Sequence, residues 1–319
     1  MSKSKVPTLP PYIFNVYKPA GLGSSDVVRH FKYHMPTGFG KIGHLGTLDP
    51  FAEGVLLIAI AGASRLSDLL HDHYPKIYNA VGRLGSFFDT GDTTGQPISE
   101  CSEETLLEFD LDALNTCANS FVGSYLQTPP MYSATKHNGK PLYKYAREGL
   151  KIDKKPVLRR IHHFRVLEIK GRDIFFECSV SSGTYIRVLF EDFCKKLNTS
   201  GALSSLKRTN IGPFTSSDSI KKSLWPQRGD QSFLDYLDAW GEAAKCPGRI
   251  FSNFQHRLSE KDWVLFKNGR DIPYNVGEIS SLTQEDVVAL YSPSGRVSGL
   301  ANFVDNKLLP FMRFSPFLE

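Results

Sequence analysis

Cysteine is scarce in this chain and follows no pattern of cross-linking or metal binding. Only five of the 319 residues are cysteine, and no two of them have the C-x-x-C spacing of zinc and redox motifs. Their odd number also argues against a complete set of disulfides. We therefore expect a protein of a reducing compartment, the cytoplasm.

Long apolar runs are missing as well. The longest, Val55 to Ala63, is far shorter than the roughly 20 apolar residues that cross a bilayer. Residues 1–12 are polar and contain proline, so they lack the apolar core of a signal peptide. The sequence predicts no association with a membrane.

Several common catalytic motifs are absent too. The sequence has no Walker loop, no dinucleotide-binding fingerprint and no G-x-S-x-G nucleophile elbow. Its histidines lack the spacing of metal ligands. His71 and His73 flank Asp72 in a polar segment, where we predict surface residues rather than ligands. No metal site is predicted.

What the chain does have is enough length for two domains and a mildly basic balance. It is 41% hydrophobic and 22% charged, which is typical of a soluble globular protein. The formal net charge is +5 and the pI is about 8.8. This balance suits a polyanionic partner such as nucleic acid without requiring one.

Periodicity and turn residues predict a larger α+β part followed by a small β part. The expected domains are residues 1–245 and 249–319. We expect strands over 13–17, 55–61 and 78–84, a hairpin over 166–180 that turns at 171–173, helices over 24–32, 63–70, 102–114 and 184–196, and C-terminal strands over 287–291, 297–303 and 308–314. Ser24 or Ser25 is the expected cap of the first helix.

The most informative stretch is His44 to Pro50, which places Asp49 in a glycine-bearing turn before a buried strand. An aspartate that precedes a proline often shapes a turn by bonding to its own backbone. It can also do chemistry. Taken alone, this fragment favours the turn-forming role.

Two later segments combine cations with aromatic or apolar residues. Residues 129–147 include Lys136 and Arg147, and residues 201–214 include Lys207 and Arg208. Such segments suit phosphate contacts and base stacking. For residues 129–147, a loop and helix with a solvated basic face explain the composition equally well. For Lys207 and Arg208, each taken singly, an exposed basic turn is nearly as good an explanation.

A third segment, Ser181 to Arg187, is a turn that leads into a helix. Free backbone amides at a helix start can hold an anion. Arg187 could pair with a carboxylate and Tyr185 could present its ring to a substrate. The alternative is a capped helix start with a core tyrosine.

Taken together and in this order, these segments resemble the TruB family of tRNA pseudouridine synthases. The resemblance covers residues 14–214 and, more weakly, residues 258–314. Its motifs are Lys18-Pro19-x-Gly21, Gly43 to Pro50, Lys76-x-Tyr78, Arg83-Leu84-Gly85, Asp89-Thr90-x-Asp92, Pro130 to Ala134, Gly183 to Arg187 and Arg208-Thr209-x-Ile211-Gly212.

The resemblance implies a fold and an activity. The fold is α+β, with a mixed, mostly antiparallel sheet flanked by helices and a small C-terminal PUA-like β domain. The activity converts uridine 55 in the T-arm stem-loop of tRNA to pseudouridine after base flipping, with no cofactor, no metal and no obligatory protein partner. Two alternatives stay open: a guide-RNA-dependent, dyskerin-like synthase and a tRNA-folding chaperone.

The resemblance also implies roles for single residues. Asp49 is the catalytic aspartate, Tyr78 stacks on the flipped base, and Tyr185 and Arg187 complete the active site. His44 helps to displace the flipped base. The expected RNA-binding residues are His44, Lys18, Asp92, Lys136, Arg147, Lys207 and Arg208, with Asp92 also bracing Arg187.

This chain departs from the family pattern at four positions. Gly23 stands where Thr or Ser is usual. Ala61 and Arg65 stand where Gly and Lys are common, and Ser182 stands where some members have Lys. None of these positions has an implied catalytic role.

Overall fold

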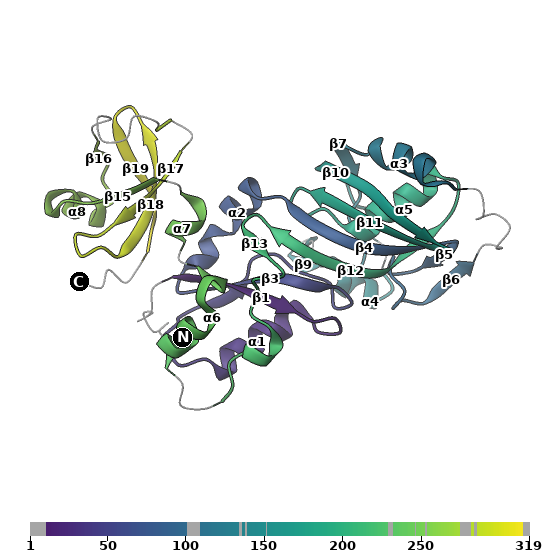
Figure 1. Cartoon of the computed structure of the whole chain (residues 1–319), viewed down its shortest axis with the longest axis horizontal. Coiled ribbons are helices and arrows are strands. Elements are labelled where there is room, and N and C mark those ends of the chain that lie inside the picture. Colours follow the sequence, from purple (N-terminus) through teal and green to yellow (C-terminus); the bar gives the residue numbers. More distant parts are fainter. Residues whose placement is uncertain are drawn as a thin grey trace.

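The computed structural model places a large mixed sheet with helices on both faces beside a small C-terminal sheet (Figure 1). It describes residues 11–100, 109–133, 136–137, 139–150, 152–228, 232–245, 247–252, 254–274, 282–283 and 286–314. The C-terminal sheet lies at one end of the long axis of the molecule, and β5 and β6 lie towards the other end.

The large sheet has ten strands, and its main order is β14-β1-β3-β12-β4-β11-β10-β7. All of its strand pairs are antiparallel except β3 with β12, which are parallel. The strands are β1 (Tyr12–Lys18), β2 (Ile42–His44), β3 (Glu53–Ile60), β4 (Lys76–Leu84), β7 (Gly123–Gln127), β10 (Val157–Lys170), β11 (Asp173–Val180), β12 (Gly201–Ile211), β13 (Phe214–Thr215) and β14 (Ala244–Lys245). The expected α+β class with a mostly antiparallel sheet is confirmed.

Burial patterns explain the central strands. Every residue of β3 from Gly54 to Ile60 is buried, as expected for a continuous apolar run with helices on both sides. In β4, buried residues alternate with more exposed ones along the whole strand. The predicted hairpin forms from β10 and β11 and turns at Gly171-Arg172.

Helices cover both faces of this sheet. They are α1 (Ser24–His34), α2 (Ser67–His73), α3 (Leu111–Asn119), α4 (Leu142–Arg147), α5 (Ile186–Lys196) and α6 (Phe233–Trp240), with a 3₁₀ turn, η1, over Ala63–Leu66. Two short hairpins, β5 (Ser86–Phe88) with β6 (Pro97–Glu100) and β8 (Lys136–His137) with β9 (Lys140–Pro141), extend from the sheet. Residues 101–108, where we expected the start of a helix, lie outside the described residues.

The expected cap of α1 was wrong. Its N-cap is Gly23, whose backbone N–H donates to the Asp26 carboxylate over 3.0 Å. The hydroxyl of Ser24 instead bonds to both backbone groups of Leu48, beside Asp49. Because those bonds occupy the Ser24 hydroxyl, it does not cap the helix. The side-chain hydrogen bond at the start of α1 is the one that the Asp26 carboxylate accepts from Gly23.

The C-terminal sheet is joined to the large one by apolar packing. It has the order β15-β17-β18-β19-β16, with β15 (Phe254–Arg257), β16 (Ile272–Pro273), β17 (Val287–Tyr291), β18 (Val297–Val304) and β19 (Lys307–Arg313), and it is accompanied by α7 (Gly248–Phe251) and α8 (Glu260–Lys267). One buried core contains Leu45 and Val55 from the large part together with Ile250, Val287 and Phe314. No helix among the described residues is long and apolar enough to cross a membrane.

Ala61 has a left-handed backbone, with φ of 50°. For an alanine this conformation costs roughly 1–2 kcal/mol, which glycine does not incur. Ala61→Gly also loses a buried methyl group and gains entropy in the unfolded chain, and each of these effects costs up to about 1 kcal/mol. We therefore expect Ala61→Gly to leave the free energy of unfolding within about 1 kcal/mol of the parent value.

Ala59→Gly is the matched control, because Ala59 is equally buried but lies within β3, paired with Ile13. Ala59→Gly also loses a buried methyl group and gains entropy in the unfolded chain, but it relieves no backbone strain. We therefore expect urea unfolding to show a free energy of unfolding that is lower by about 1–2 kcal/mol. Equal losses for the two variants would contradict the strain at Ala61.

Candidate active site

The loop from Leu45 to Ala52 carries Asp49 between β2 and β3, and its backbone is tied at almost every residue. Leu45 N–H donates to Leu57 O over 2.8 Å, and Ala52 N–H donates to Asp49 O over 3.1 Å. Ser24 holds Leu48 as described above. The loop is therefore fixed from both sides before any side chain of the pocket is considered.

Arg208 on β12 ties two more residues of this loop to the sheet. No part of its side chain is exposed. Its guanidinium donates to the carbonyls of Gly46, Thr47 and Val55 over 3.1, 3.2 and 2.8 Å. It also donates to the hydroxyl of Tyr78 over 3.4 Å. Arg208 thus joins the Asp49 loop to β3 and β4.

Lys18 at the end of β1 acts on the other side of the loop. Its ammonium donates to the carbonyls of Pro19, Leu22 and Pro50 over 3.0, 2.6 and 3.2 Å, and its side chain is fully buried. The expectation that Lys18 and Arg208 bind RNA directly does not hold in this structure, because neither side chain reaches the surface. Lys18 donates to three backbone carbonyls, and Arg208 donates to three backbone carbonyls and the Tyr78 hydroxyl.

Asp49 forms an ion pair with Arg187 at the start of α5, with 2.9 Å between Oδ2 and Nε. The Arg187 side chain is 4% exposed, whereas that of Asp49 is 28% exposed. Arg187 also donates to the carbonyls of Thr90 and Tyr132. The arginine is therefore fixed within the protein, and the carboxylate that it orients stays accessible.

Asp92 lies 3.9 Å from Arg187, between Oδ2 and Nη1, and is 5% exposed. Its other carboxylate oxygen accepts from the backbone and hydroxyl of Thr94. These contacts agree with the expected bracing of Arg187. A direct contact of Asp92 with RNA stays a prediction.

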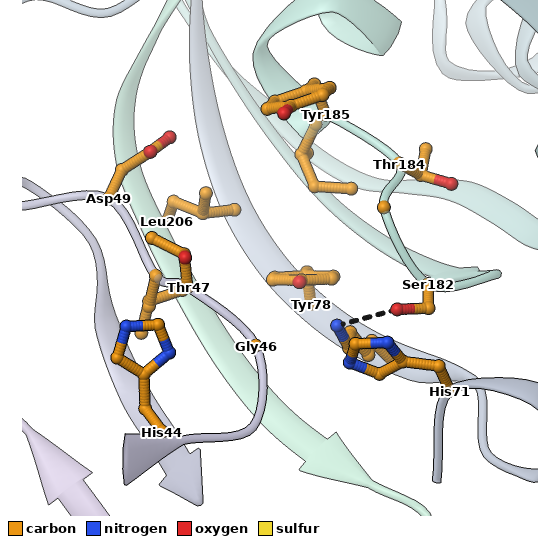
Figure 2. Close-up of a pocket in the computed structure, with 14 residues that line it drawn as sticks. His44, Gly46, Thr47, Asp49, His71, Tyr78, Ser182, Thr184, Tyr185 and Leu206 are labelled. Atoms are coloured by element: carbon orange, nitrogen blue, oxygen red, sulfur yellow. Dashed lines mark hydrogen bonds between the residues drawn. The ribbon is translucent and has the colours of Figure 1, made fainter. Parts of the chain in front are cut away.

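A pocket of about 340 Å³ opens beside Asp49. Figure 2 shows Asp49 and Tyr185 towards one end, Ser182 and His71 towards the other, and the ring of Tyr78 between them. The wall is completed by His44, Gly46, Thr47, Leu48, Lys76, Gly183, Thr184, Ile186 and Leu206. The sheet and α5 thus bring all four predicted catalytic residues, Asp49, Tyr78, Tyr185 and Arg187, to one place.

Burial shifts the pKa values of several titratable side chains that line the pocket. It lowers the pKa of His44 and of His71 below the ordinary value, so both rings are neutral at pH 7. It lowers the pKa of Lys76 to about 7, with a further contribution from the charges of Arg208 and Arg159. Burial also raises the pKa of the Tyr78 hydroxyl.

Among the remaining expected residues, Lys207 is half-buried, with its ammonium 5.8 Å from the centre of the Tyr17 ring. Lys136 lies in β8, and Arg147 is the last residue of α4. Direct RNA contacts by these three residues stay predictions. Among the described residues, no group of three or more His, Cys, Asp or Glu side chains could hold a metal ion.

Sequence reasoning missed three residues of the site. His71, predicted as a surface residue, lines the pocket. Lys76 was named only within a motif, although it precedes Tyr78 by two residues on a strand and so shares its face. Nothing in the sequence indicates that Arg159, on β10, packs against the turn at Gly183, where a Cβ atom would lie 3.0 Å from its guanidinium.

Comparisons with known proteins agree with this geometry. Residues 34–186 match the family described as TruB family pseudouridylate synthase (N terminal domain). The tRNA pseudouridine synthase B of Clostridium novyi is 41% identical over 88% of this chain and 90% of its own length. The protein of the same name from Fusobacterium nucleatum is 32% identical over 93% and 97%, respectively.

Among solved structures, the chain resembles one in a Cbf5-Nop10-Gar1 complex, with a TM-score of 0.62 and 22% identity over 96% of this chain and 85% of that one. At this identity the likeness concerns the fold alone. The family match and the curated relatives show that the chain is a pseudouridylate synthase. Within that class, the chain belongs to the TruB family.

Replacing Arg208 tests its structural role. Arg208→Met leaves buried carbonyls of the Asp49 loop without donors, so we expect the free energy of unfolding to fall by about 3 kcal/mol or more. Lys207→Met is the matched control, because Lys207 is the adjacent residue on β12 and also carries a positive charge, but it is only half-buried. It should change stability by less than about 0.5 kcal/mol.

Urea unfolding of both variants gives the comparison. If Lys207 contacts phosphate, its variant should also bind RNA with a salt slope reduced by about one. An Arg208→Met protein as stable as the parent would contradict the assignment of Arg208 to the loop.

Proposed function

We propose that the protein converts uridine 55 in the T-arm of tRNA to pseudouridine, with Asp49 as the catalytic residue. The observation that carries this proposal is the accessible carboxylate of Asp49, held by the buried Arg187 at the mouth of an aromatic pocket. The relatives named above are tRNA pseudouridine synthases, which supports tRNA as the substrate.

The substrate nucleotide must leave the stack of the T-loop before its glycosidic bond can be reached. A flipped pyrimidine needs an aromatic face, and the Tyr78 ring provides one inside the pocket. The nearby Leu206 supplies an apolar contact for the base. Stacking on these side chains then offsets part of the free energy of unstacking.

The isomerisation breaks the bond between N1 of uracil and C1′ of ribose, and forms one between C5 and C1′. C5 loses a proton and N1 gains one, so the reaction has no net redox change. An ionised Asp49 can serve it as nucleophile or as base. Arg187 fixes the position of the carboxylate for either role, since the guanidinium is itself held by the carbonyls of Thr90 and Tyr132.

His44 stands across the pocket from Ser182 and His71 (Figure 2), and its Nδ1 has no partner among the described residues. Because its pKa is lowered, it meets RNA as a neutral ring with one donor and one acceptor. This suits the proposed role of occupying the space that the flipped base leaves. The mildly basic composition of the chain suits a polyanionic substrate such as tRNA, and we place this activity in the cytoplasm as part of the proposal.

Asp49→Asn tests the catalytic role. The amide keeps the shape of the side chain but cannot act as nucleophile or base, so we expect pseudouridine formation on a T-arm stem-loop to fall by at least a thousandfold. Binding of the stem-loop should change less than about fivefold. Mass spectrometry of the RNA measures conversion, and a filter assay measures binding.

Asp238→Asn, on the exposed face of α6, is the matched control and should leave both quantities unchanged. Turnover near the parent rate in Asp49→Asn would remove the catalytic assignment. A chaperone role would be favoured if the inactive variant restored the phenotype of a strain that lacks the protein.

A further inference from the structure

The two ends of the pocket differ in charge. At one end, Asp49 is paired with Arg187, and Asp92 lies close by. At the other end the charged group is Lys76, and the charges that act on it, Arg208 and Arg159, are both positive. Within the described part of the chain, no carboxylate forms an ion pair with Lys76, so this end of the pocket is a buried cationic site.

Lys76 is also short of hydrogen-bond acceptors. Its ammonium has three donors, and among the described residues it bonds to one acceptor, the Ser182 hydroxyl, over 3.1 Å (Figure 2). The side chain is 5% exposed. A buried ammonium that leaves donors unused, with no neighbouring carboxylate among the described residues, is unfavourable in the free protein.

Other groups at this end point to the same kind of ligand. The buried Nε2 of His71 has no partner among the residues that the structure describes. A Cβ atom added to Gly46 would lie 3.1 Å from the Lys76 ammonium and 3.7 Å from that nitrogen, so both face the space beside this glycine. Gly46 has φ of 112°, which favours glycine there.

We propose that Lys76, with Ser182 and His71, binds a phosphodiester of the substrate RNA next to the nucleotide whose base stacks on Tyr78. This inference rests on the proposed function. Uracil is neutral and fits the aromatic and apolar middle of the pocket. The anionic group that a flipped nucleotide brings with it is its backbone phosphate, which complements an unpaired ammonium.

Phosphate binding would have a signature in pH. The charged and titratable groups that face Lys76 are Arg208 on β12, Arg159 on β10 and His71 on α2, and Asp68 and Asp72 act on His71 in turn. The pKa of Lys76 is about 7 in the free protein, and a phosphate would raise it. Above pH 7, binding then takes up a proton and weakens as the pH rises.

The first test uses Lys76→Met, an apolar side chain of similar length. We expect a T-arm stem-loop to bind this variant roughly ten- to a hundredfold more weakly at pH 7. Its affinity should lose the decline between pH 7 and 9 that the parent shows. Because the ammonium is unfavourable in the free protein, the variant should unfold at the same or a higher urea concentration.

The second test removes the phosphate charge instead. Two stem-loops each contain one neutral methylphosphonate linkage, one on the 5′ side and the other on the 3′ side of the target uridine. Both of these RNAs, and a reference RNA with ordinary phosphates, have a 2′-deoxy sugar before each of the two tested linkages. At one of the two positions, the methylphosphonate should weaken binding to the parent protein about tenfold and binding to Lys76→Met less than twofold. Equal losses in both proteins at both positions would overturn the proposal.

Lys170→Met is the matched lysine control. Lys170 is exposed and forms an ion pair with Glu168. In the strand register it lies opposite Asp173, which lies opposite Arg83, so it is at the far end of β4 from Lys76. It should show the full effect of the methylphosphonate and the pH dependence of the parent. A lower unfolding midpoint for Lys76→Met, with unchanged affinity, would make Lys76 a structural residue and contradict the proposal.

The outcomes separate this inference from the proposed function. A parent protein that neither binds nor converts the unmodified stem-loop would refute the function itself. Conversion of that stem-loop, together with additive effects of Lys76→Met and the methylphosphonates, would refute the phosphate site alone.

Discussion

One buried guanidinium determines how the loop that carries Asp49 is positioned on the sheet. Arg208 lies in register with Gly54 of β3 on one side and Tyr78 of β4 on the other, and its donors hold the carbonyls of Gly46 and Thr47. A loop that lies across a sheet has inward carbonyls that water cannot reach, so they need donors from the protein. The residue that satisfies them thereby fixes the position of Asp49, only two residues further along.

The same constraint explains a glycine in β3. A Cβ atom on Gly54 would lie 2.2 Å from the carbonyl oxygen of Arg208, and its φ is 109°. The parallel pairing of β3 with β12 brings their backbones this close. Larger residues would push β12 away and take the guanidinium out of reach of the loop. Packing of two backbones, hydrogen bonding of the loop and placement of the acid therefore depend on one another.

Much of the fold could be predicted from local patterns, whereas the roles of charged residues could not. The alternation in β4 and the hairpin of β10 and β11 follow from side-chain periodicity and turn residues. Lys207 and Arg208 are adjacent and similar in charge, yet one is half-buried and the other fully buried. Which of them faces inward depends on the position of β12 within the sheet, which no local pattern contains.

The C-terminal part packs against the residue that begins the same loop. Leu45, immediately before Gly46, shares its apolar core with Val55 of β3 and with Ile250, Val287 and Phe314 of the C-terminal part. Arg65 also donates to the carbonyl of Arg313 over 2.6 Å, and Tyr74 donates to that of Ile250 over 2.5 Å. Apolar burial is non-directional but adds up over a shared core. The C-terminal part therefore supports the Asp49 loop through packing.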